Sequence, residues 1–246
     1  MLAGCLALSV ALLVATACSD GDSPSPTAAA TAAGTKGATS PPQGSSGDPT
    51  DPAVFARLKL PLDLAKGASI GNPDAKVTLE AYEDFQCPFC LLFTMLLEPT
   101  VMDEYVAPGK VRFVFRNFPI LGAESVRAAL ASVCAADEEK FWPFHQRLFL
   151  EQAKAGQLDG EKLNVGRFSP ENLRTYATDA GAAGAAFDAC VQDAVTLAKV
   201  QDEVDSARQL GLRGTPSLVL NGKPVATPPD AAAMRKLLDD ALAAAK

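Results

Sequence analysis

The sequence holds six cysteines and one histidine among 246 residues, and two of the cysteines stand together in Cys87-Pro88-Phe89-Cys90. This segment lies where a predicted strand gives way to a predicted helix. The first cysteine therefore meets unpaired backbone N–H groups and the positive end of the helix dipole. Such surroundings lower a thiol pKa from about 8.5 to about 3.5–7.5, and only the thiolate attacks disulfides. The spacing brings the second sulfur within reach of a disulfide. The pattern predicts thiol–disulfide exchange, with Cys87 as nucleophile and Cys90 as buried resolving thiol.

Two cysteines at this spacing are also compatible with half of a zinc site. The sequence has no second pair of this kind, and its one histidine, His145, excludes any site that needs two imidazole ligands. We therefore expect neither a metal nor a cofactor. The formal net charge is −7 and Lys and Arg form no run, so nucleic acid is not an expected partner.

The elements that must position the cysteine pair follow from hydrophobic periodicity. Their order is strand, helix, strand, several helices, β-hairpin and helix, which indicates an α/β fold. Pro99 interrupts the first helix, where we expect a kink. The predicted strands cover 77–82 and 110–116 and the hairpin 217–225, and the predicted helices cover 89–105, 123–136, 140–152 and 191–210, with two more that start at about 169 and 229.

The N-terminal segment resembles an export signal. Residues 1–17 carry no charged side chain, and this length suits a signal peptide better than a spanning helix, which needs roughly 20 apolar residues. Small residues precede Cys18, as in bacterial lipoprotein signals, and Cys5 falls within the signal itself. The resemblance implies that Cys18 is lipidated and anchors the protein to the outer face of the cell membrane. A plain secretory signal, giving a secreted or periplasmic protein, and an uncleaved anchor are the alternatives.

The next segment, residues 18–52, is dominated by Ser, Pro, Thr, Ala, Gly and Asp, with no aromatic residue and no Leu, Ile or Val. This composition cannot bury enough apolar surface to offset the entropy of the chain. We therefore expect a disordered tether, followed by a folded domain at 53–246.

A second motif raises the specificity of the prediction. Residues 211–220 read GLRGTPSLVL, and the lead-in to the cysteine pair reads Glu83-Asp84-Phe85-Gln86. Taken with Cys87–Cys90, these segments strongly resemble the DsbA-like thiol:disulfide oxidoreductases of the thioredoxin superfamily, over roughly residues 66–238. The resemblance implies a thioredoxin fold with a helical insertion at about 120–210, between an N-terminal βαβ part and a C-terminal ββα part.

The same resemblance implies a substrate site. A cis peptide bond before Pro216 is expected beside the active disulfide, with client peptides bound at Thr215, Pro216, Pro88 and Phe89. An ordinary trans proline at the start of a strand is the alternative, because only about 5–6% of X-Pro bonds in folded proteins are cis.

One position departs from the family pattern. Many relatives carry a buried acid six residues before the nucleophile, where this chain has Ala81. Strand alternation places Glu83 on the same face as Ala81, while Asp84 points the other way. Our hypothesis is that Glu83 takes over proton transfer to and from Cys90. The alternative is that Glu83 and Asp84 are solvated beside the turn and that no such group is needed.

The remaining cysteines, Cys134 and Cys190, lie in the predicted insertion. Export favours oxidation, and a similar second bridge occurs in some DsbA-like proteins of high-GC Gram-positive bacteria, so we predict a structural disulfide worth about 2–4 kcal/mol. Two buried free thiols are the alternative. His145 closes the segment Phe141-Trp142-Pro143-Phe144-His145, and we expect it to pack on a helix face rather than to act as an acid or base.

The first functional hypothesis is an extracytoplasmic dithiol oxidase. It would introduce disulfides into reduced exported proteins and be reoxidised by a membrane partner, either DsbB-like or similar to vitamin-K-epoxide reductase. A disulfide reductase or isomerase is the second hypothesis, since Phe89 stands where a strongly oxidising relative has His. A lipoprotein that binds a peptide or copper is the third, although a binding protein needs no activated thiol.

Overall fold

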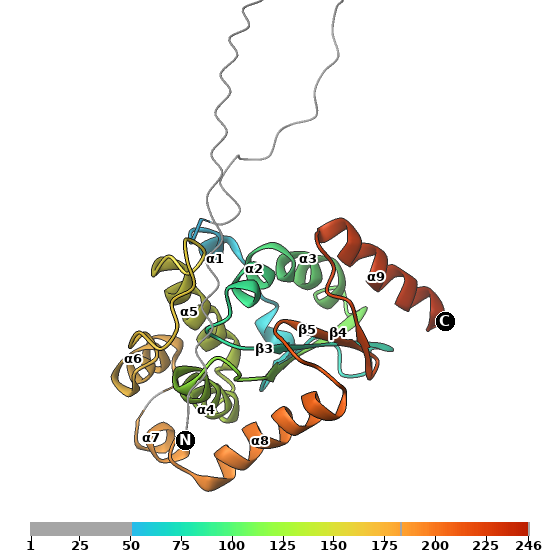
Figure 1. The fold of residues 1–246 in the computed structure, drawn as a ribbon. Helices are drawn as coiled ribbons and strands as arrows, with labels where there is room; N and C mark the ends of the chain where they lie inside the picture. Colours follow the sequence, from blue (N-terminus) through green and yellow to red (C-terminus); the bar gives the residue numbers. More distant parts are fainter. Residues whose placement is uncertain (1–50, 183, 246) are drawn as a thin grey trace, which may run out of the picture. The chain divides into compact units, whose positions relative to one another are not determined.

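Six strands form one sheet in the computed structural model of the chain, which describes residues 51–182 and 184–245 (Figure 1). The predicted signal peptide, Cys5, Cys18 and the predicted tether up to residue 50 lie outside the described residues. The strand order is β1-β2-β4-β3-β5-β6, so β3 lies near the centre of the sheet. The strands are β1 (Ala65–Lys66), β2 (Ser69–Ile70), β3 (Val77–Glu83), β4 (Val111–Asn117), β5 (Ser217–Leu220) and β6 (Lys223–Val225).

Strand β3 carries the chain into the cysteine pair. It pairs in parallel with β4 and antiparallel with β5, which begins 134 residues after β3 ends (217 − 83). Leu79 and Ala81 are buried in the larger core, whereas Tyr82 points to the opposite face and packs with Val219 and Val204. Both faces of the strand are therefore covered, as expected for the centre of a sheet between helical layers.

The β5–β6 hairpin turns at Asn221 and Gly222, as the sequence predicted. Their φ angles are 48° and 77°, and a two-residue hairpin turn of this kind needs positive φ at both positions. The Asn221 side chain also accepts a hydrogen bond from the Thr78 backbone N–H at 2.8 Å. This contact ties the hairpin to β3.

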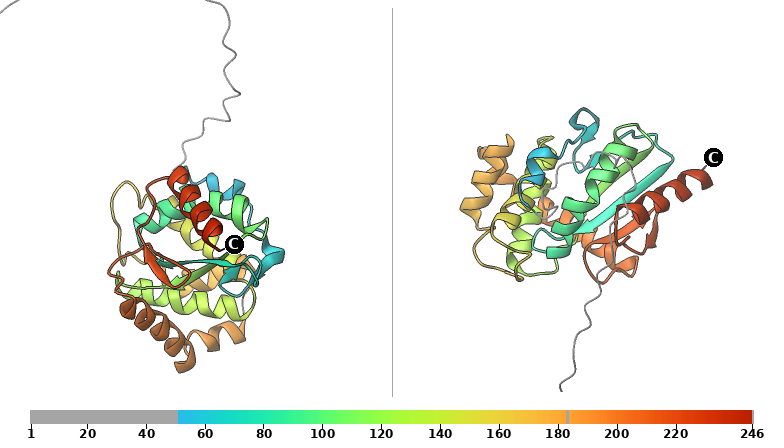
Figure 2. Two further views of the ribbon diagram at one scale, coloured as in Figure 1. Left: turned by 90° about the vertical axis from the view of Figure 1, so that its right-hand side faces the viewer. Right: turned by 90° about the horizontal axis from the view of Figure 1, so that it is seen from above.

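Helices cover the sheet on both faces (Figures 1 and 2). Helix α9 contributes Met234 and Leu238 to the larger core, and α8 contributes Val204 and Ala207 to the smaller core on the other face. Helices α4 to α8 follow β4 and precede β5, which confirms the helical insertion. The helices are α1 (Val54–Arg57), α2 (Pro88–Leu96), α3 (Glu98–Val101), α4 (Ala123–Asp137), α5 (Phe141–Lys154), α6 (Pro170–Ala180), α7 (Ala185–Cys190), α8 (Ala194–Gln209) and α9 (Ala231–Ala244), with a 3-10 turn η1 (Leu62–Leu64) and a π turn η2 (Met102–Val106). Among the described residues, no helix has the length and apolarity that crossing a membrane requires.

The break between α2 and α3 confirms the interruption predicted at Pro99, which lacks the backbone N–H that a continuous helix needs, and η2 continues the segment to Val106. One predicted helix starts later than expected. The helix predicted to start at residue 191 starts at Ala194, where the Asp193 side chain accepts a hydrogen bond from Val195 N–H and caps it. The short elements α1, α7, β1 and β2 were not predicted.

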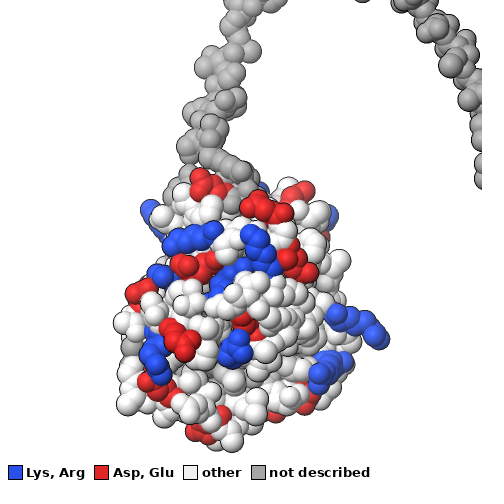
Figure 3. Space-filling view, turned by 60° about the vertical axis from the view of Figure 1, so that its left-hand side comes forward, with Lys and Arg blue, Asp and Glu red and all other residues white. Residues whose placement is uncertain are grey.

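Charged side chains of both signs share the surface seen in Figure 3. Exposed pairs include Arg174 with Asp188 at 2.8 Å and Lys236 with Asp240 at 2.7 Å. Ion pairs this exposed contribute little to stability. The face drawn there presents no continuous area of one charge sign.

Candidate active site

The cysteine pair lies where β3 passes into α2. Cys87 is the N-cap of α2, and Pro88 occupies the first turn of the helix, where a missing N–H is tolerated. Cys90 is fully buried one turn further on. Both thiols are free in the structure.

Asp84 holds the turn that leads into the pair. Its carboxylate accepts hydrogen bonds from the backbone N–H groups of Gln86 at 2.8 Å and of Ile120 and Leu121 at 2.8 and 2.9 Å. The Ser125 hydroxyl donates a further hydrogen bond at 2.6 Å. Asp84 therefore fixes the active-site turn to the loop before α4. The sequence did not reveal this role, because all of these partners except Gln86 lie 36 to 41 residues away.

The two thiols differ in acidity. Hydrogen bonding from the Cys90 side chain is the largest of the effects that lower the pKa of Cys87 to about 7, and the Thr215 side chain and the N–H groups of Phe89 and Cys90 lower it further against the effect of burial. Burial is the main cause that raises the pKa of Cys90 well above its usual value. At neutral pH, Cys87 is thus partly a thiolate while Cys90 stays protonated.

The Thr215–Pro216 segment directly precedes β5, the neighbour of β3 in the sheet, and contacts the cysteine pair. The peptide bond between these residues is cis. The Cys87 thiol donates a hydrogen bond to the Thr215 carbonyl oxygen, with 3.2 Å between Sγ and O. Residues 128 positions apart are thereby brought into contact.

Glu83, the last residue of β3, lies behind the pair with only 1% of its surface exposed. Burial is the main cause that raises its pKa well above the usual value, and the neighbouring charges of Glu98 and Cys87 add to the rise. In turn, Glu83 raises the pKa of Cys90, after the larger effects of burial and of the Cys87 side chain. The alternative that Glu83 and Asp84 are solvated is wrong, because both side chains are buried inside the fold.

His145 lies on α5 with no exposed surface, among aromatic rings. Burial lowers its pKa to about 3, so the imidazole is neutral at physiological pH. The rings around it belong to Phe85, Phe115, Phe141, Trp142 and Phe149. Across residues 51–182 and 184–245, no three His, Cys, Asp or Glu side chains gather as a metal ion would require.

A groove of about 500 Å³ opens beside the cysteine pair. Phe89 is 66% exposed and lines this groove together with Thr215 and Pro216. Pro88 is half-buried and does not line it. The other lining residues are Leu92, Phe93, Leu96, Leu97, Thr227, Pro228, Pro229, Asp230 and Ala231. The surface next to Cys87 is thus mainly apolar, with little charge to select a partner.

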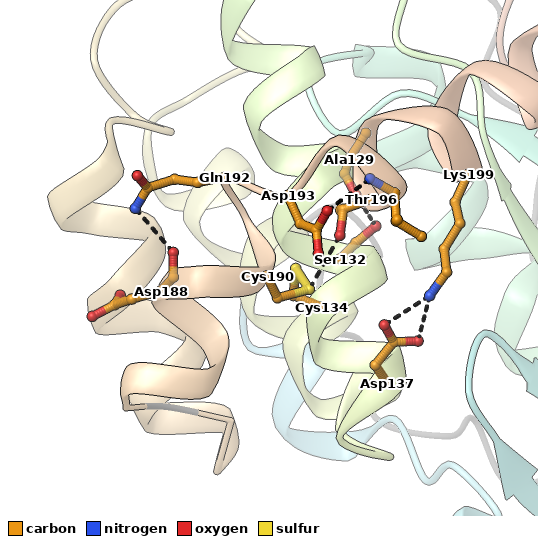
Figure 4. Close-up of a disulfide and its surroundings, with 11 residues drawn as sticks. Ala129, Ser132, Cys134, Asp137, Asp188, Cys190, Gln192, Asp193, Thr196 and Lys199 are labelled. Atoms are coloured by element: carbon orange, nitrogen blue, oxygen red, sulfur yellow. Dashed lines mark hydrogen bonds and ion pairs between the residues drawn. A yellow bond between two sulfur atoms is a disulfide. The ribbon is translucent and has the colours of Figure 1, made fainter.

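The second cysteine pair lies in the insertion (Figure 4). A disulfide joins Cys134 of α4 to Cys190 of α7, with their Cα atoms 5.8 Å apart. Cys134 is buried, and the Cys190 sulfur lies 3.3 Å from the Thr196 hydroxyl at the start of α8. The bridge thus fastens α7 and the entry of α8 onto α4.

Known proteins resemble this chain over most of its folded part. The family model described as thioredoxin matches residues 64–240. A probable disulfide bond formation protein D of Bacillus anthracis is 28% identical over 71% of this chain and 77% of its own length. A Na(+)/H(+) antiporter, NhaA 1 of Mycolicibacterium gilvum, is 32% identical over 78% of this chain, which spans only 29% of that protein. The crystal structure of oxidised BdbD from Bacillus subtilis superposes with a TM-score of 0.61 and 24% identity, over 72% of this chain and 93% of BdbD.

Proposed function

The chain belongs to the thioredoxin family, and from that membership we propose that it is an extracytoplasmic dithiol oxidase that passes a Cys87–Cys90 disulfide to exported proteins. It is a DsbA-like protein thiol:disulfide oxidoreductase. The observation that carries the proposal is the geometry of the pair: Cys87 caps α2 with its sulfur 3.2 Å from the Thr215 carbonyl oxygen, and Cys90 is buried one turn behind it. Relatives named disulfide bond formation protein D support the oxidising direction.

The exchange proceeds through a mixed disulfide. A client thiolate attacks the Cys87 sulfur, the Cys87–Cys90 bond breaks, and Cys90 leaves with the electron pair. A second client thiolate then attacks the first client sulfur and releases Cys87 as a thiolate. The client loses two electrons and two protons and gains a disulfide, and the cysteine pair takes up the two electrons. Cys87 is the better leaving group because its pKa is the lower of the two.

Glu83 is the proton-transfer residue in this proposal. Cys90 must take up a proton when it leaves as a thiolate, and it must lose one before it can close the disulfide again. The Glu83 carboxyl lies beside Cys90 in the core, and burial raises its pKa well above the usual value, which favours the protonated form that can supply this proton. If Glu83→Gln leaves both the rate of Cys90 deprotonation and the turnover unchanged, this role is excluded.

The apolar groove supplies the client site. Unfolded proteins expose apolar side chains, which would pack on Phe89 and the groove walls, while the backbone runs past Thr215 and Pro216. We assign Thr215, Pro216 and Phe89 to client binding. Pro88 starts the helix that holds the pair and shapes the site from outside the groove.

The proposed location is the outer face of the cell membrane. Lipidated Cys18 would anchor the chain, and a coil of about 34 residues would let the folded part reach roughly 30 Å from the membrane. A DsbB-like protein or one similar to vitamin-K-epoxide reductase would be within reach to reoxidise the pair. Replacing Cys18 by Ala and fractionating the cells tests the anchor, since an unlipidated chain would be released.

A reductase or isomerase is the second candidate, favoured by one observation. The pKa of Cys87, at about 7, lies near the value of about 7 that is typical of thioredoxin, and far from the value of about 3.5 in the strong oxidant DsbA. A less stable Cys87 thiolate stabilises the reduced form of the pair less, so the disulfide is a weaker oxidant.

The reduction potential of the Cys87/Cys90 couple separates the two directions. A potential of about −120 to −180 mV supports the oxidase, and one near about −270 mV supports a reductase. Equilibration with glutathione or dithiothreitol gives the value, and the Cys87→Ser variant is the control that must show no couple. A potential at the reducing end would overturn the oxidase.

A further inference from the structure

Four polar side chains come together in the core on the Cys90 side of the sheet. They are Glu83 at the end of β3, Thr94 in α2, Glu98 at the start of α3 and His145 in α5. The exposed fraction is 1% for Glu83 and zero for the other three. The exchange reaction as described above uses only Glu83 of these four.

These side chains lack hydrogen bonds within the part of the chain that the structure describes. No partner meets ordinary hydrogen-bond geometry at either carboxyl oxygen of Glu83 or Glu98, at the Thr94 hydroxyl or at the ring nitrogens of His145. The nearest polar groups, Cys90 beside Glu83 and Thr94 beside Glu98, only oppose the rise in the two pKa values. An ionised carboxylate in such surroundings costs several kcal/mol unless it is paired. The arrangement therefore favours protonated, neutral carboxyl groups.

Among residues 51–182 and 184–245, no cationic group is a cause of the pKa shift of either carboxyl group. The groups that shift the pKa of Glu83 are Glu98, Cys87 and Cys90, all of them neutral or negative. The His145 Nε2 atom lies 3.9 Å from the Glu98 Oε2 atom, but burial lowers the pKa of His145 to about 3. Burial also raises the pKa of Glu98 to about 8, and the neighbouring Thr94 hydroxyl opposes that rise. Two carboxyl groups that share a buried space without a cation cannot both ionise.

We propose that Glu98 is a positioning residue of the exchange reaction, which makes Glu83 and Glu98 a carboxyl pair that gives up only one proton behind Cys90. This inference rests on the proposed function, because Cys90 needs a proton only when its disulfide opens. The Glu83 proton passes to the departing Cys90 sulfur, and the same proton returns when the disulfide closes. At neutral pH Glu98 keeps its own proton, so during exchange the pair carries no more than one negative charge. The two groups titrate as a unit.

The first test titrates the carboxyl groups directly. Infrared spectra of the full chain carrying Cys87→Ser report the C=O stretch of protonated carboxyl groups without interference from exchange. We expect this signal to persist at neutral pH. In Glu98→Gln the signal should weaken, and the remaining Glu83 should lose its proton at least about one pH unit lower. In the unsubstituted pair Glu98 ionises first as pH rises, and its charge then holds the proton on Glu83.

Two further variants make this titration specific. Thr94→Val removes the hydroxyl that stabilises ionised Glu98, so the Glu98 titration should move upward, opposite to the shift of Glu83 in Glu98→Gln. Glu203→Gln is the matched control, since Glu203 is an acid of α8 with a raised pKa that is paired with Asn117 and Arg116. It should leave the Glu83 titration in place. An absent carboxyl signal at neutral pH, or an unshifted Glu83 in Glu98→Gln, overturns the inference.

The second test separates this inference from the proposed function. In the full chain with both cysteines, the rate at which Cys90 expels glutathione from a Cys87 mixed disulfide should rise with pH, with its midpoint at the Glu83 pKa. Glu98→Gln should move that midpoint down by about one pH unit. If the unsubstituted chain exchanges normally and Glu98→Gln follows the same profile, the role of Glu98 fails and the proposed function stands. If the unsubstituted chain does not exchange at all, the proposed function fails.

Discussion

The two cysteine pairs of the folded chain lie in opposite surroundings. Cys87 and Cys90 share one helix end, Cys87 contacts Thr215, and the buried carboxyl group of Glu83 raises the pKa of Cys90. Cys134 and Cys190 come from separate helices of the insertion, 56 residues apart, and a disulfide joins them. Position in the fold, rather than residue type, thus decides which pair can react.

Loop length explains why one bridge can be structural and the other can be exchanged. A bridge that closes a 56-residue loop removes much chain entropy from the unfolded state, worth about 4 kcal/mol. A bridge between residues three positions apart closes a far smaller loop, so opening it costs the fold little. The reactive pair can therefore cycle while the structural pair keeps the insertion in place.

The largest expected effect separates the pairs by activity. Cys87→Ser should lower the rate of client oxidation by at least about a thousandfold, because it removes the attacked sulfur. The double variant Cys134→Ser/Cys190→Ser should keep most of the rate at a temperature where it remains folded. Oxidation of a reduced model protein, followed by alkylation and mass measurement, gives both rates. If the rate of client oxidation fell equally in the two variants, the assignment of one pair as reactive and the other as structural would be wrong.

The next effect separates the pairs by stability. Replacing Cys134 and Cys190 by Ala should lower the free energy of unfolding by about 2–4 kcal/mol, the usual range for a bridge of this kind. Urea unfolding of the oxidised chain and of the variant measures the difference. The matched control is Cys87→Ala/Cys90→Ala, measured against the chain with its reactive pair oxidised, which should lose less. If the control lost more unfolding free energy than the Cys134/Cys190 variant, the Cys87–Cys90 bridge would be the one that stabilises the fold.

The lesson for sequence interpretation differs between the two pairs as well. Alternation along β3 placed Glu83 on the buried face, and the motifs placed Cys87 and Thr215, since these are properties of neighbouring residues. The role of Glu98 could not be predicted, because a Glu beside Pro99 in a helix resembles an ordinary surface residue. Its burial depends on the break between α2 and α3 and on α5, more than 40 residues later. Long-range packing of this kind leaves no local pattern.

Buried acids near the reactive pair should also give stability a pH dependence that the structural bridge lacks. The pKa of Glu98 is about 8 in the fold and 4.5 in its ordinary state, so between these values the folded chain holds a proton that the unfolded chain has lost. Stability therefore falls as pH rises through this window, by at most about 1.4 kcal/mol per pH unit for this one group. His145 opposes the trend below its ordinary value of 6.5, because its pKa is lowered in the fold.

Urea unfolding at about pH 6.5 and about pH 8 is measured on the chain with its Cys87–Cys90 disulfide closed, so that Cys87, with a pKa of about 7 as a free thiol, does not titrate. His145 is neutral in both states over most of that range, and the difference between the unsubstituted chain and Glu98→Gln gives the contribution of Glu98. Glu98→Gln should reduce the fall of the unfolding free energy with pH. The double variant Cys134→Ala/Cys190→Ala should lower the unfolding free energy by the same amount at both pH values and leave its pH dependence unchanged. If the unfolding free energy of Glu98→Gln falls with pH as steeply as that of the unsubstituted chain, the pH dependence comes from Glu83 alone.

The smallest effect concerns client recognition beside the reactive pair. Phe89 is 66% exposed at the groove, and packing of its ring on a client should contribute about 1 kcal/mol, which corresponds to roughly a fivefold change in affinity. Phe89→Ser should therefore raise the KM for an unfolded client about fivefold, with little change in the reaction with glutathione, which is too small to fill the groove. Val195→Ser on α8 is the matched control, because Val195 is 62% exposed and does not line the groove. If Phe89→Ser slowed glutathione and the client alike, Phe89 would act on the thiols themselves, and the client would have to be held elsewhere.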